Sequence, residues 1–402
     1  MNIVILHRLP YGKIRYDQAI DHAEHRVDYL CLPGGQADLP PGSHHHDVAS
    51  FEPEELARQC ASLLHRADRL IARSEYELLA AAELLAAAEL RERFAIAGDR
   101  PQDILPLRDK WAMRVRCEAA GIPQPAFWSL ETFSRLPDSP GSFVLKPRLE
   151  ASSTGIVMGD RQRLLDAIGQ LTRLDDYFVE AFIQGEICHI DGFLREGELV
   201  QAITSRYVGN CLDYAGGAPL GSVQIAPQPQ MEALLRQTLA ALGQRQGCFH
   251  FELIEDHQGG LYFLETACRV GGAGVADTFA LRTGLNLYHI DLQYQLHGKI
   301  TQQAAPLSDT HYGWFVYPAH HRGEAQRIHF DHGRWGALLH SWHQAKPNMA
   351  RPGSISYAPG ATPLSGIVQG RAETLPPALG ALLEQTRVEY ISTPPARMEA
   401  SA

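Results

Sequence analysis

The chain has 402 residues, of which 45% are hydrophobic and 20% charged, values typical of globular proteins and unlike those of disordered or coiled-coil chains. This length exceeds one compact core and predicts roughly two to four domains, with room for a cleft between them. Asp and Glu total 46 against 36 Lys and Arg, and the net charge of -10 argues against a large nucleic-acid-binding surface.

The N-terminus and the cysteines favour a cytoplasmic protein without disulfides. Residues 1–7 form too short an apolar run for a signal peptide, and no stretch of about 18 apolar residues could cross a membrane. The seven cysteines are dispersed without a C-x-x-C pair, so neither a disulfide nor a structural zinc is expected. The run His44–Asp47 lies in a Pro/Gly-rich stretch and is interpreted as a solvated loop, with transition-metal binding as the less favoured alternative.

The first hundred residues alternate strand and helix patterns. Strands are expected over 3–6, 27–32 and 69–72, and a helix over 52–65, which predicts a parallel α/β sheet. Ser74, with Glu77 three residues later, forms a capping box at the start of an Ala/Leu/Glu helix that ends near Phe94.

The middle of the chain combines a helix, several strands and a small polar loop. A helix is expected from Leu107 to Gly121, and strands over 142–146, 177–183 and 187–194. Residues 150–155 are small and polar, which indicates a mobile loop. Strands over 248–255 and 260–265 form a hairpin around the turn 256–259.

After about residue 300 the pattern changes to a separate small α+β unit. Short strands are expected over 313–317, 354–357 and 366–370, followed by a helix over 375–385. The last residues, from Ser392, are expected to form a loose tail.

Several residues have the chemistry that magnesium nucleotides require, namely oxygen ligands, cations and a phosphate-binding backbone. A Walker A motif is absent, so a P-loop cannot provide it. Lys146 ends a strand, where it either points into a cleft or is an ordinary edge-strand lysine. The loop Ser152–Gly155 can cover phosphates with backbone N–H groups, although a plain surface loop would have the same sequence.

Two carboxylates and an arginine form the most informative cluster. Hairpin pairing places Glu252 near Glu265, and a divalent cation would relieve their repulsion, whereas solvent exposure is the alternative. Arg269 follows Glu265 by four residues and precedes the glycine-rich run 271–274, so its guanidinium can hold a carboxylate or phosphoryl group. An i,i+4 helical ion pair is the alternative, but the position between a strand and a glycine loop favours the site.

In this order, the segments resemble the ATP-grasp superfamily, specifically its carboxylate-amine ligases related to the bacterial L-amino acid ligases. The resemblance covers nearly the whole chain and extends to residues 71–75, 94–98 and 108–110. It implies an α/β protein with an ATP-grasp fold. The implied domains are an N-terminal Rossmann-like domain (1–105), the ATP-grasp nucleotide-binding and catalytic domains (106–300), a small C-terminal α+β domain (301–392) and a tail (393–402).

The resemblance also implies the cofactors, ATP and Mg²⁺ with Mn²⁺ as a substitute, and a role for each site residue. The ATP-binding residues would be Lys110 and Lys146 at the phosphates, Ser152, Ser153 and Gly155 in the covering loop, Glu180, Ala181, Phe182 and Ile183 at the base, and Glu186 at the ribose. Glu252 and Glu265 would bind the metal. Arg269 and the backbone of Gly271 and Gly272 would hold the acyl phosphate and the tetrahedral intermediate.

One residue departs from the family motif E-x-N-x-R. The segment 265–269 has Ala267 in place of the asparagine, which removes one expected oxygen ligand. The second metal is therefore expected to be bound differently, more weakly, or with Thr266 or water compensating.

The implied reaction is attack of a substrate carboxylate on the γ-phosphorus of ATP, followed by attack of an amine on the acyl phosphate. Asp213 is the candidate partner of a substrate amine, and His189 and Asp191, on one strand face, either line the pocket or form a buried polar pair. The resemblance implies two small-molecule substrates, a carboxylate that is an amino acid and an amine. Neither nucleic acid nor a membrane is an expected partner, and a homodimer is left open. Loading of a carrier-protein thiol and a non-catalytic nucleotide-binding regulator are the alternatives.

Overall fold

The protein is described by a computed structural model that covers residues 1–73, 82–137, 140–307, 309–320, 325–346, 355–357 and 361–390. The chain divides into two compact units, each built from several segments. The first unit comprises residues 1–204, 227–271 and 283–306, and the second comprises residues 205–226, 272–282 and 307–402. The domain boundaries predicted from the sequence stay predictions.

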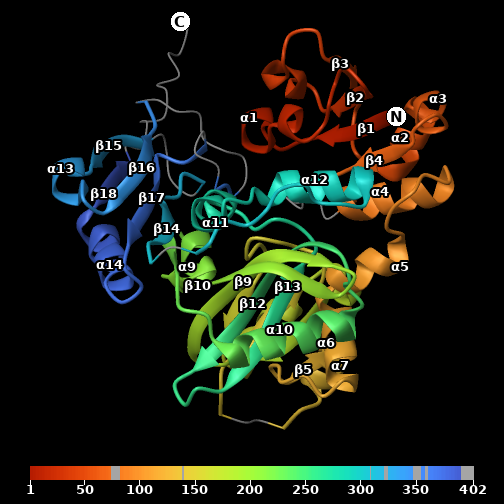
Figure 1. Cartoon of the computed structure of the whole chain (residues 1–402). Coiled ribbons are helices and arrows are strands. Elements are labelled where there is room, and N and C mark those ends of the chain that lie inside the picture. Colours follow the sequence, from red (N-terminus) through yellow and green to blue (C-terminus); the bar gives the residue numbers. More distant parts are fainter. Residues whose placement is uncertain are drawn as a thin grey trace, which may run out of the picture. The chain divides into compact units, whose positions relative to one another are not determined.

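The first unit begins with a parallel four-stranded sheet in the order β3-β2-β1-β4, as the alternation of strand and helix patterns predicted. Its strands are β1 (Asn2–His7), β2 (Arg26–Cys31), β3 (His44–Asp47) and β4 (Arg69–Ile71), and its helices are α1 (Tyr11–Ile14), α2 (Pro53–Gln59), α3 (Ala61–Leu64) and α4 (Ala82–Arg93). These elements are labelled in Figure 1. Apolar side chains of β1, β4, α2 and α4 form one buried core. Burial on the sheet explains the nearly continuous apolar runs of these strands.

The prediction that His44–Asp47 is a loop was wrong, because these residues form the edge strand β3. Its backbone pairs in parallel with residues 28–31 of β2, while all four side chains are exposed. An edge strand whose faces are both exposed to solvent does not require apolar residues. The four polar residues therefore showed no hydrophobic pattern from which a strand could be predicted. His46 Nε2 lies 3.0 Å from Asp28 Oδ1, which anchors the strand at its centre.

Two helix boundaries also differ from the prediction. The expected helix over 52–65 is interrupted at Cys60, which separates α2 from α3. The helix expected from Leu107 begins at Lys110, because the Asp109 carboxylate accepts hydrogen bonds from the amides of Trp111 and Ala112 and caps the helix there. The capping box at Ser74 and Glu77 lies outside the described residues.

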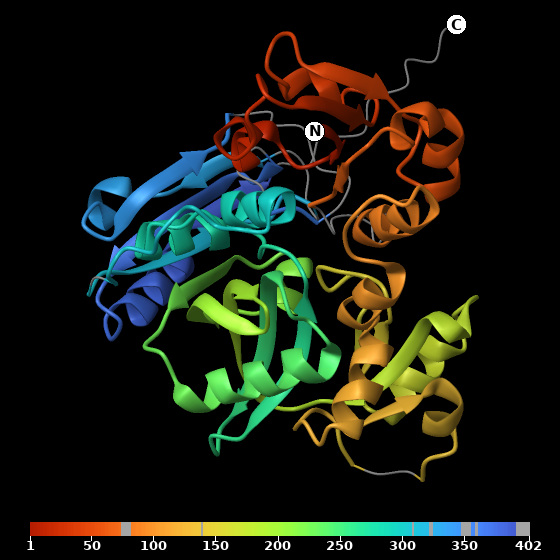
Figure 2. The same ribbon diagram turned by 45° about the vertical axis from the view of Figure 1, so that its right-hand side comes forward.

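A small antiparallel sheet follows in the order β5-β8-β6-β7. It consists of β5 (Phe127–Ser129), β6 (Phe143–Pro147), β7 (Val157–Gly159) and β8 (Tyr177–Ala181), with α5 (Pro101–Ile104), α6 (Lys110–Ala119), α7 (Leu130–Ser134) and α8 (Arg161–Ile168) before and between its strands. Leucine and phenylalanine side chains of α7 and α8 pack on β6 and β8. These elements belong to the orange and yellow part of the ribbon in Figure 2.

The first unit also holds the antiparallel strands that carry the acidic cluster. β9 (Gly185–Arg195) pairs with β12 (Gly247–Asp256), and β12 pairs with β13 (Leu261–Ala267). The hairpin of β12 and β13 confirms the sequence prediction, and the Asp256 carboxylate accepts hydrogen bonds from the amides of Gln258 and Gly260 in its turn. Helix α10 (Pro229–Leu242) lies along these strands in Figure 1, and α12 (Leu287–His297) contacts β12 and β9.

The chain passes to the second unit within β10 (Glu198–Val208). There, the end of β10 pairs with β11 (Leu220–Gln224), which is followed across the sheet by β14 (His311–Val316), β17 (Leu364–Gly370) and β16 (Leu339–Gln344). Helix α14 (Leu375–Gln385) packs on β11, β14 and β17 and has the bounds expected from the sequence. The remaining elements are α9 (Cys211–Ala215), α11 (Val275–Thr283), α13 (His332–Trp335) and the pair β15 (Ala325–His329) and β18 (Arg387–Tyr390).

The strand expected over 354–357 is not formed by its described part, Ile355–Tyr357. The side chain of Tyr357 instead stacks on Tyr214, with ring centroids 4.7 Å apart, so that aromatic packing fixes this segment without strand pairing. Residues 351–354 and the expected tail lie outside the described residues. Within the described part of the chain, no helix is both long and apolar enough to cross a membrane.

Replacing Asp109 tests how α6 is anchored. The buried carboxylate caps the helix and also pairs with Arg148 beyond β6, so Asp109→Ala should lower the free energy of unfolding by about 2–3 kcal/mol. Asp160→Ala, which removes only the cap of α8, should cost about 1 kcal/mol. Urea unfolding measures both, and equal losses would show that the pair with Arg148 contributes nothing.

Candidate active site

Three neighbouring strands place six residues on one face of the sheet. Glu252 of β12 lies directly opposite Glu265 of β13 on one side and His189 of β9 on the other. Two residues earlier on β12, the same register brings His250 opposite Ala267 and Asp191. Because side chains alternate along a strand, both rows point to the same face. The sequence prediction that the hairpin brings Glu252 near Glu265 is therefore confirmed.

Lys110 brings a cation to this carboxylate pair. It is the first residue of α6, and its Nζ lies 3.5 Å from Glu265 Oε2 and donates to the backbone carbonyl of Glu150 at 2.5 Å. Burial raises the pKa of Glu265, but Lys110 and then Lys146 outweigh it and lower this pKa to about 2. Glu265 thus stays ionised at neutral pH, as a metal ligand must be.

Lys146, the second predicted phosphate-binding lysine, is held by a buried carboxylate. Its Nζ lies 2.7 Å from Glu180 Oε2, and Arg114 Nε of α6 lies 2.6 Å from Glu180 Oε1. Burial raises the pKa of Glu180, but Arg114 and Lys146 outweigh it, so the pKa is lowered. Only 1% of Glu180 is exposed, and both of its oxygens bind cations. Glu180 thus contacts two cations in this structure, and its contact with the base stays a prediction.

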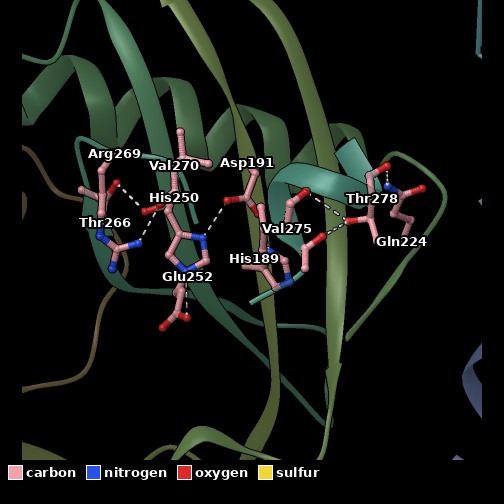
Figure 3. A network of polar contacts seen from close by, with 11 residues as sticks. His189, Asp191, Gln224, His250, Glu252, Thr266, Arg269, Val270, Val275 and Thr278 are labelled. Carbon is pink, nitrogen blue, oxygen red and sulfur yellow. Dashed lines mark hydrogen bonds and ion pairs between the residues drawn. The ribbon is translucent and has the colours of Figure 1, made fainter. Parts of the chain in front are cut away.

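A second polar network lies behind Glu252. Asp191 Oδ2 is 2.5 Å from His189 Nδ1, and Asp191 Oδ1 is 2.7 Å from His250 Nδ1. Figure 3 shows His250 between Asp191 and Glu252, with Nε2 3.3 Å from Glu252 Oε1. Burial lowers the pKa of His250, but the two carboxylates outweigh it and raise the pKa to about 10. His189 and Asp191 are the buried polar pair that was one of the two sequence interpretations.

Arg269 follows β13 and begins the glycine-containing loop. Its guanidinium donates to the carbonyl of Val270 at 2.9 Å (Figure 3), while Thr266 donates to the backbone carbonyl of His250 at 3.1 Å. Gly271 belongs to the first unit, and Gly272 starts the turn before α11 in the second. Cys268 packs against the N-terminal core.

The loop at 152–155 has left-handed backbone at three of its four residues. Ser152, Ser153 and Gly155 all have positive φ angles of 55, 58 and 72°. Such left-handed backbone is uncommon for residues with a side chain, and it turns successive amides toward one side of the loop. This conformation is compatible with the predicted covering of phosphates, which stays a prediction.

The residues expected at the base and ribose lie at the end of β8 and the start of β9. The amides of Ala181 and Phe182 donate to the carbonyls of Ala126 and Ser142, so a base would be bound through other backbone atoms of this segment. Ile183 is half-buried, whereas Phe182 and Glu186 are exposed. Their contacts with a nucleotide stay predictions.

The second unit contains Asp213 and an apolar pocket. Asp213 is exposed in α9 and accepts a hydrogen bond from the Asn210 amide, a local contact, so its role toward a substrate amine stays a prediction. The pocket has a volume of about 600 Å³, within the range of small-molecule sites, and Ala273, Trp314 and Trp342 contribute to its lining. Gly274 is required there, because a Cβ atom would lie 2.5 Å from Trp314 Cβ.

Sequence reasoning missed Arg114 and His250, although a signal existed for both. Arg114 lies four residues after Lys110 and therefore shares its helix face. His250 lies two residues before Glu252 and therefore shares its strand face. Neither residue belongs to a motif that the sequence displays, so only the periodicity could have indicated them.

Removing Arg114 tests the buried charge network. Arg114→Met should lower the free energy of unfolding by about 3–5 kcal/mol at pH 7, because it leaves Glu180 buried with one cation fewer. The pKa of Glu180 is lowered, so its stabilising contribution is present above the ordinary value of 4.5 and is lost as the pH falls. The difference in the free energy of unfolding between Arg114→Met and the wild type should therefore become smaller as the pH falls below 4.5.

The matched control is Arg116→Met on the same helix. Arg116 is exposed and donates to the carbonyl of Leu242 at 3.2 Å, so its loss should cost about 1 kcal/mol or less at every pH. Urea unfolding between pH 7 and pH 3 measures both variants. A deficit of Arg114→Met that stayed constant over this range would contradict the assigned role of Glu180.

Comparison with known proteins gives relatives for both the sequence and the fold. No family model matches the chain. The L-arginine-specific L-amino acid ligase of Bacillus subtilis is 24% identical over 252 residues, which are 58% of this chain and 60% of that protein. The chain thus matches less than two thirds of the length of this curated relative.

Solved structures match nearly the whole chain. An L-amino acid ligase from Bacillus licheniformis has a TM-score of 0.70 at 19% identity and covers 97% of this chain and 98% of its own. The biotin carboxylase domain of the Hydrogenobacter thermophilus 2-oxoglutarate carboxylase, a dimer in complex with MgADP, ADP and bicarbonate, has a TM-score of 0.68 at 14% identity, covering 97% and 91%. The solved structures confirm the expected ATP-grasp fold, and the sequence match is to an L-amino acid ligase, as the resemblance implied.

Proposed function

We propose that this protein is an ATP-dependent carboxylate-amine ligase that joins an amino acid to an amine through an acyl phosphate and releases ADP and phosphate. The observation that carries the proposal is the pair Glu252 and Glu265, in register on adjacent strands, with Lys110 Nζ 3.5 Å from Glu265. The relatives named above support the reaction class, and the amino acid ligases among them support an amino acid as the carboxylate substrate.

Carboxylates and cations at this site suit a magnesium nucleotide. Glu252 and Glu265 would hold Mg²⁺, which when bound neutralises charge on the phosphates. Lys110 and Lys146 would bind phosphate oxygens, and Glu180 with Arg114 keeps the Lys146 ammonium in place. The substrate carboxylate oxygen attacks the γ-phosphorus, the bond to the ADP oxygen breaks, and ADP leaves. The protein thereby acts by positioning and by charge compensation.

The second step forms the amide bond without a covalent enzyme intermediate. The amine attacks the acyl carbon, the tetrahedral intermediate carries an oxyanion, and phosphate leaves as the carbonyl re-forms. Arg269 and the backbone amides of Gly271 and Gly272 would hold the oxyanion and the departing phosphate. Both substrates are small molecules, and a reaction that consumes ATP agrees with a cytoplasmic location.

The reaction class is tested by the products. With ATP, Mg²⁺ and a panel of amino acids as carboxylate and amine, the protein should release ADP and phosphate in equal amounts. This release should continue at a sustained rate only when an amine is present. Coupled assays for ADP and phosphate, with mass spectrometry of the amide, measure this. Release of AMP and pyrophosphate would exclude the acyl phosphate mechanism.

The two steps are separated by two substitutions. Lys146→Ala should weaken ATP binding roughly 10- to 100-fold, because a charge-assisted hydrogen bond to phosphate is lost. Arg269→Ala should leave ATP binding nearly intact and lower kcat by about 10²- to 10³-fold, the usual loss for an oxyanion-binding donor. Calorimetric titration with an ATP analogue and steady-state kinetics measure the two effects.

Conservative variants control for structural damage. Lys146→Arg keeps a positive charge beside Glu180, and Arg269→Lys keeps the charge but loses the bidentate fork. Lys146→Arg should therefore regain part of the ATP affinity, and both variants should unfold at the wild-type urea midpoint. Full activity of Arg269→Ala would refute its assigned role.

A further inference from the structure

Ala267 and His250 form a directly opposed pair across β13 and β12. They lie on the sheet face that carries Glu252 and Glu265, one step along the strands. Ala267 has no atom that can bind a metal, and it replaces the asparagine of the related motif. Its methyl group is small, so the opposite strand can place an imidazole over this position.

We propose that Nε2 of His250 is the third protein ligand of the divalent cation bound by Glu252 and Glu265. This inference rests on the proposed function, which places the cation at these two carboxylates. His250 Nε2 lies 3.3 Å from Glu252 Oε1, the distance of a charge-assisted hydrogen bond, and a cation bound between the two atoms would replace the proton on Nε2. His250 of β12 thus replaces the metal ligand that is missing at position 267 of β13.

The surroundings of His250 are those of a metal-binding histidine. Its Nδ1 lies 2.7 Å from Asp191 Oδ1, and the other oxygen of Asp191 lies 2.5 Å from His189 Nδ1. A carboxylate only accepts hydrogen bonds when ionised, so Asp191 holds a proton on Nδ1 of His250, and Nε2 is the nitrogen that can exchange its proton for a metal ion. Metal-bound imidazoles usually donate their other N–H to a carboxylate, which fixes the ring orientation.

The ligand atoms of His189, Asp191 and His250 all lie within 4.8 Å of one another, which is close enough for a metal site formed by these three residues alone. The nitrogen-oxygen separations of 2.5 and 2.7 Å are hydrogen-bond distances. Two ligands at roughly 2.1 Å from one ion would be about 3 Å or more apart. Asp191 and His189 therefore support His250 and do not enclose an ion with it.

A nitrogen ligand changes the metal preference. A site of carboxylates and an amide offers only oxygen atoms, which suit Mg²⁺, whereas an added imidazole favours transition metals. The protein with a bound ATP analogue should accordingly bind Mn²⁺ more tightly than Mg²⁺. Mn²⁺ is paramagnetic, so it also reports which protein atoms bind to it.

Pulsed electron paramagnetic resonance of the full chain with Mn²⁺ and a non-hydrolysable ATP analogue tests the proposal. We expect a coupling to histidine ¹⁴N that becomes a ¹⁵N coupling when the protein is labelled with ¹⁵N-histidine, while nucleotide nitrogens stay unchanged. The labelled protein has the wild-type sequence, so a folding defect cannot confuse the result. Mn²⁺ bound with the analogue but without histidine coupling would overturn the inference alone, and no analogue-dependent Mn²⁺ binding would overturn the proposed function as well.

Substitutions identify which histidine is involved. His250→Ala should abolish the coupling and weaken Mn²⁺ binding at least about 10-fold, as loss of metal-site partners does. Adding Ala267→Asn to that variant should restore binding without a histidine coupling, because an amide oxygen then faces the same space. His257→Ala, in the exposed turn of the same hairpin, is the control and should change neither property. Wild-type Mn²⁺ affinity in His250→Ala would overturn the proposal.

Discussion

The antiparallel pairing of β12 with both β9 and β13 is the constraint on which the rest of the site depends. Its register fixes Glu252 between Glu265 and His189, and His250 between Ala267 and Asp191. Hydrogen-bonded strands hold neighbouring Cα atoms about 5 Å apart, so these side chains cannot separate to relieve their repulsion. The two neighbouring carboxylates are stable at this position only because a cation compensates their charge. In the metal-free protein this cation is Lys110, and in the proposed reaction a divalent ion is added.

Glu180 connects two elements that would otherwise present their cations independently. Arg114 comes from α6, the helix that also begins with Lys110, and Lys146 comes from β6. One buried carboxylate binding both cations fixes the distance between helix and strand and therefore the spacing of the two predicted phosphate-binding lysines. A buried ion pair contributes little net stability because desolvation opposes it, so its value here is geometric.

Much of this arrangement could be predicted from the sequence, and the failures have physical causes. The hairpin of Glu252 and Glu265 was predictable because its strands have a period of two and a turn with Asp and Gly. The strand at His44–Asp47 was not, because an exposed edge strand carries no hydrophobic pattern. The buried position of Glu180 was not either, since its partners Arg114 and Lys146 lie 66 and 34 residues away in the chain and only tertiary structure brings them together.

The pair His250 and Ala267 shows why a motif along one strand describes a metal site incompletely. Ligands on a sheet are neighbours in two directions, along the strand and across it, and a cation responds only to the positions of their atoms. A side chain lost from β13 can therefore be replaced by one from the opposed position of β12 without any change in backbone. Along the sequence the two positions are 17 residues apart, so the loss at Ala267 is visible while the replacement at His250 is not. The strand register places the two positions directly opposite each other, and from this we infer that the chain binds its cation with the imidazole of His250 in place of the missing amide.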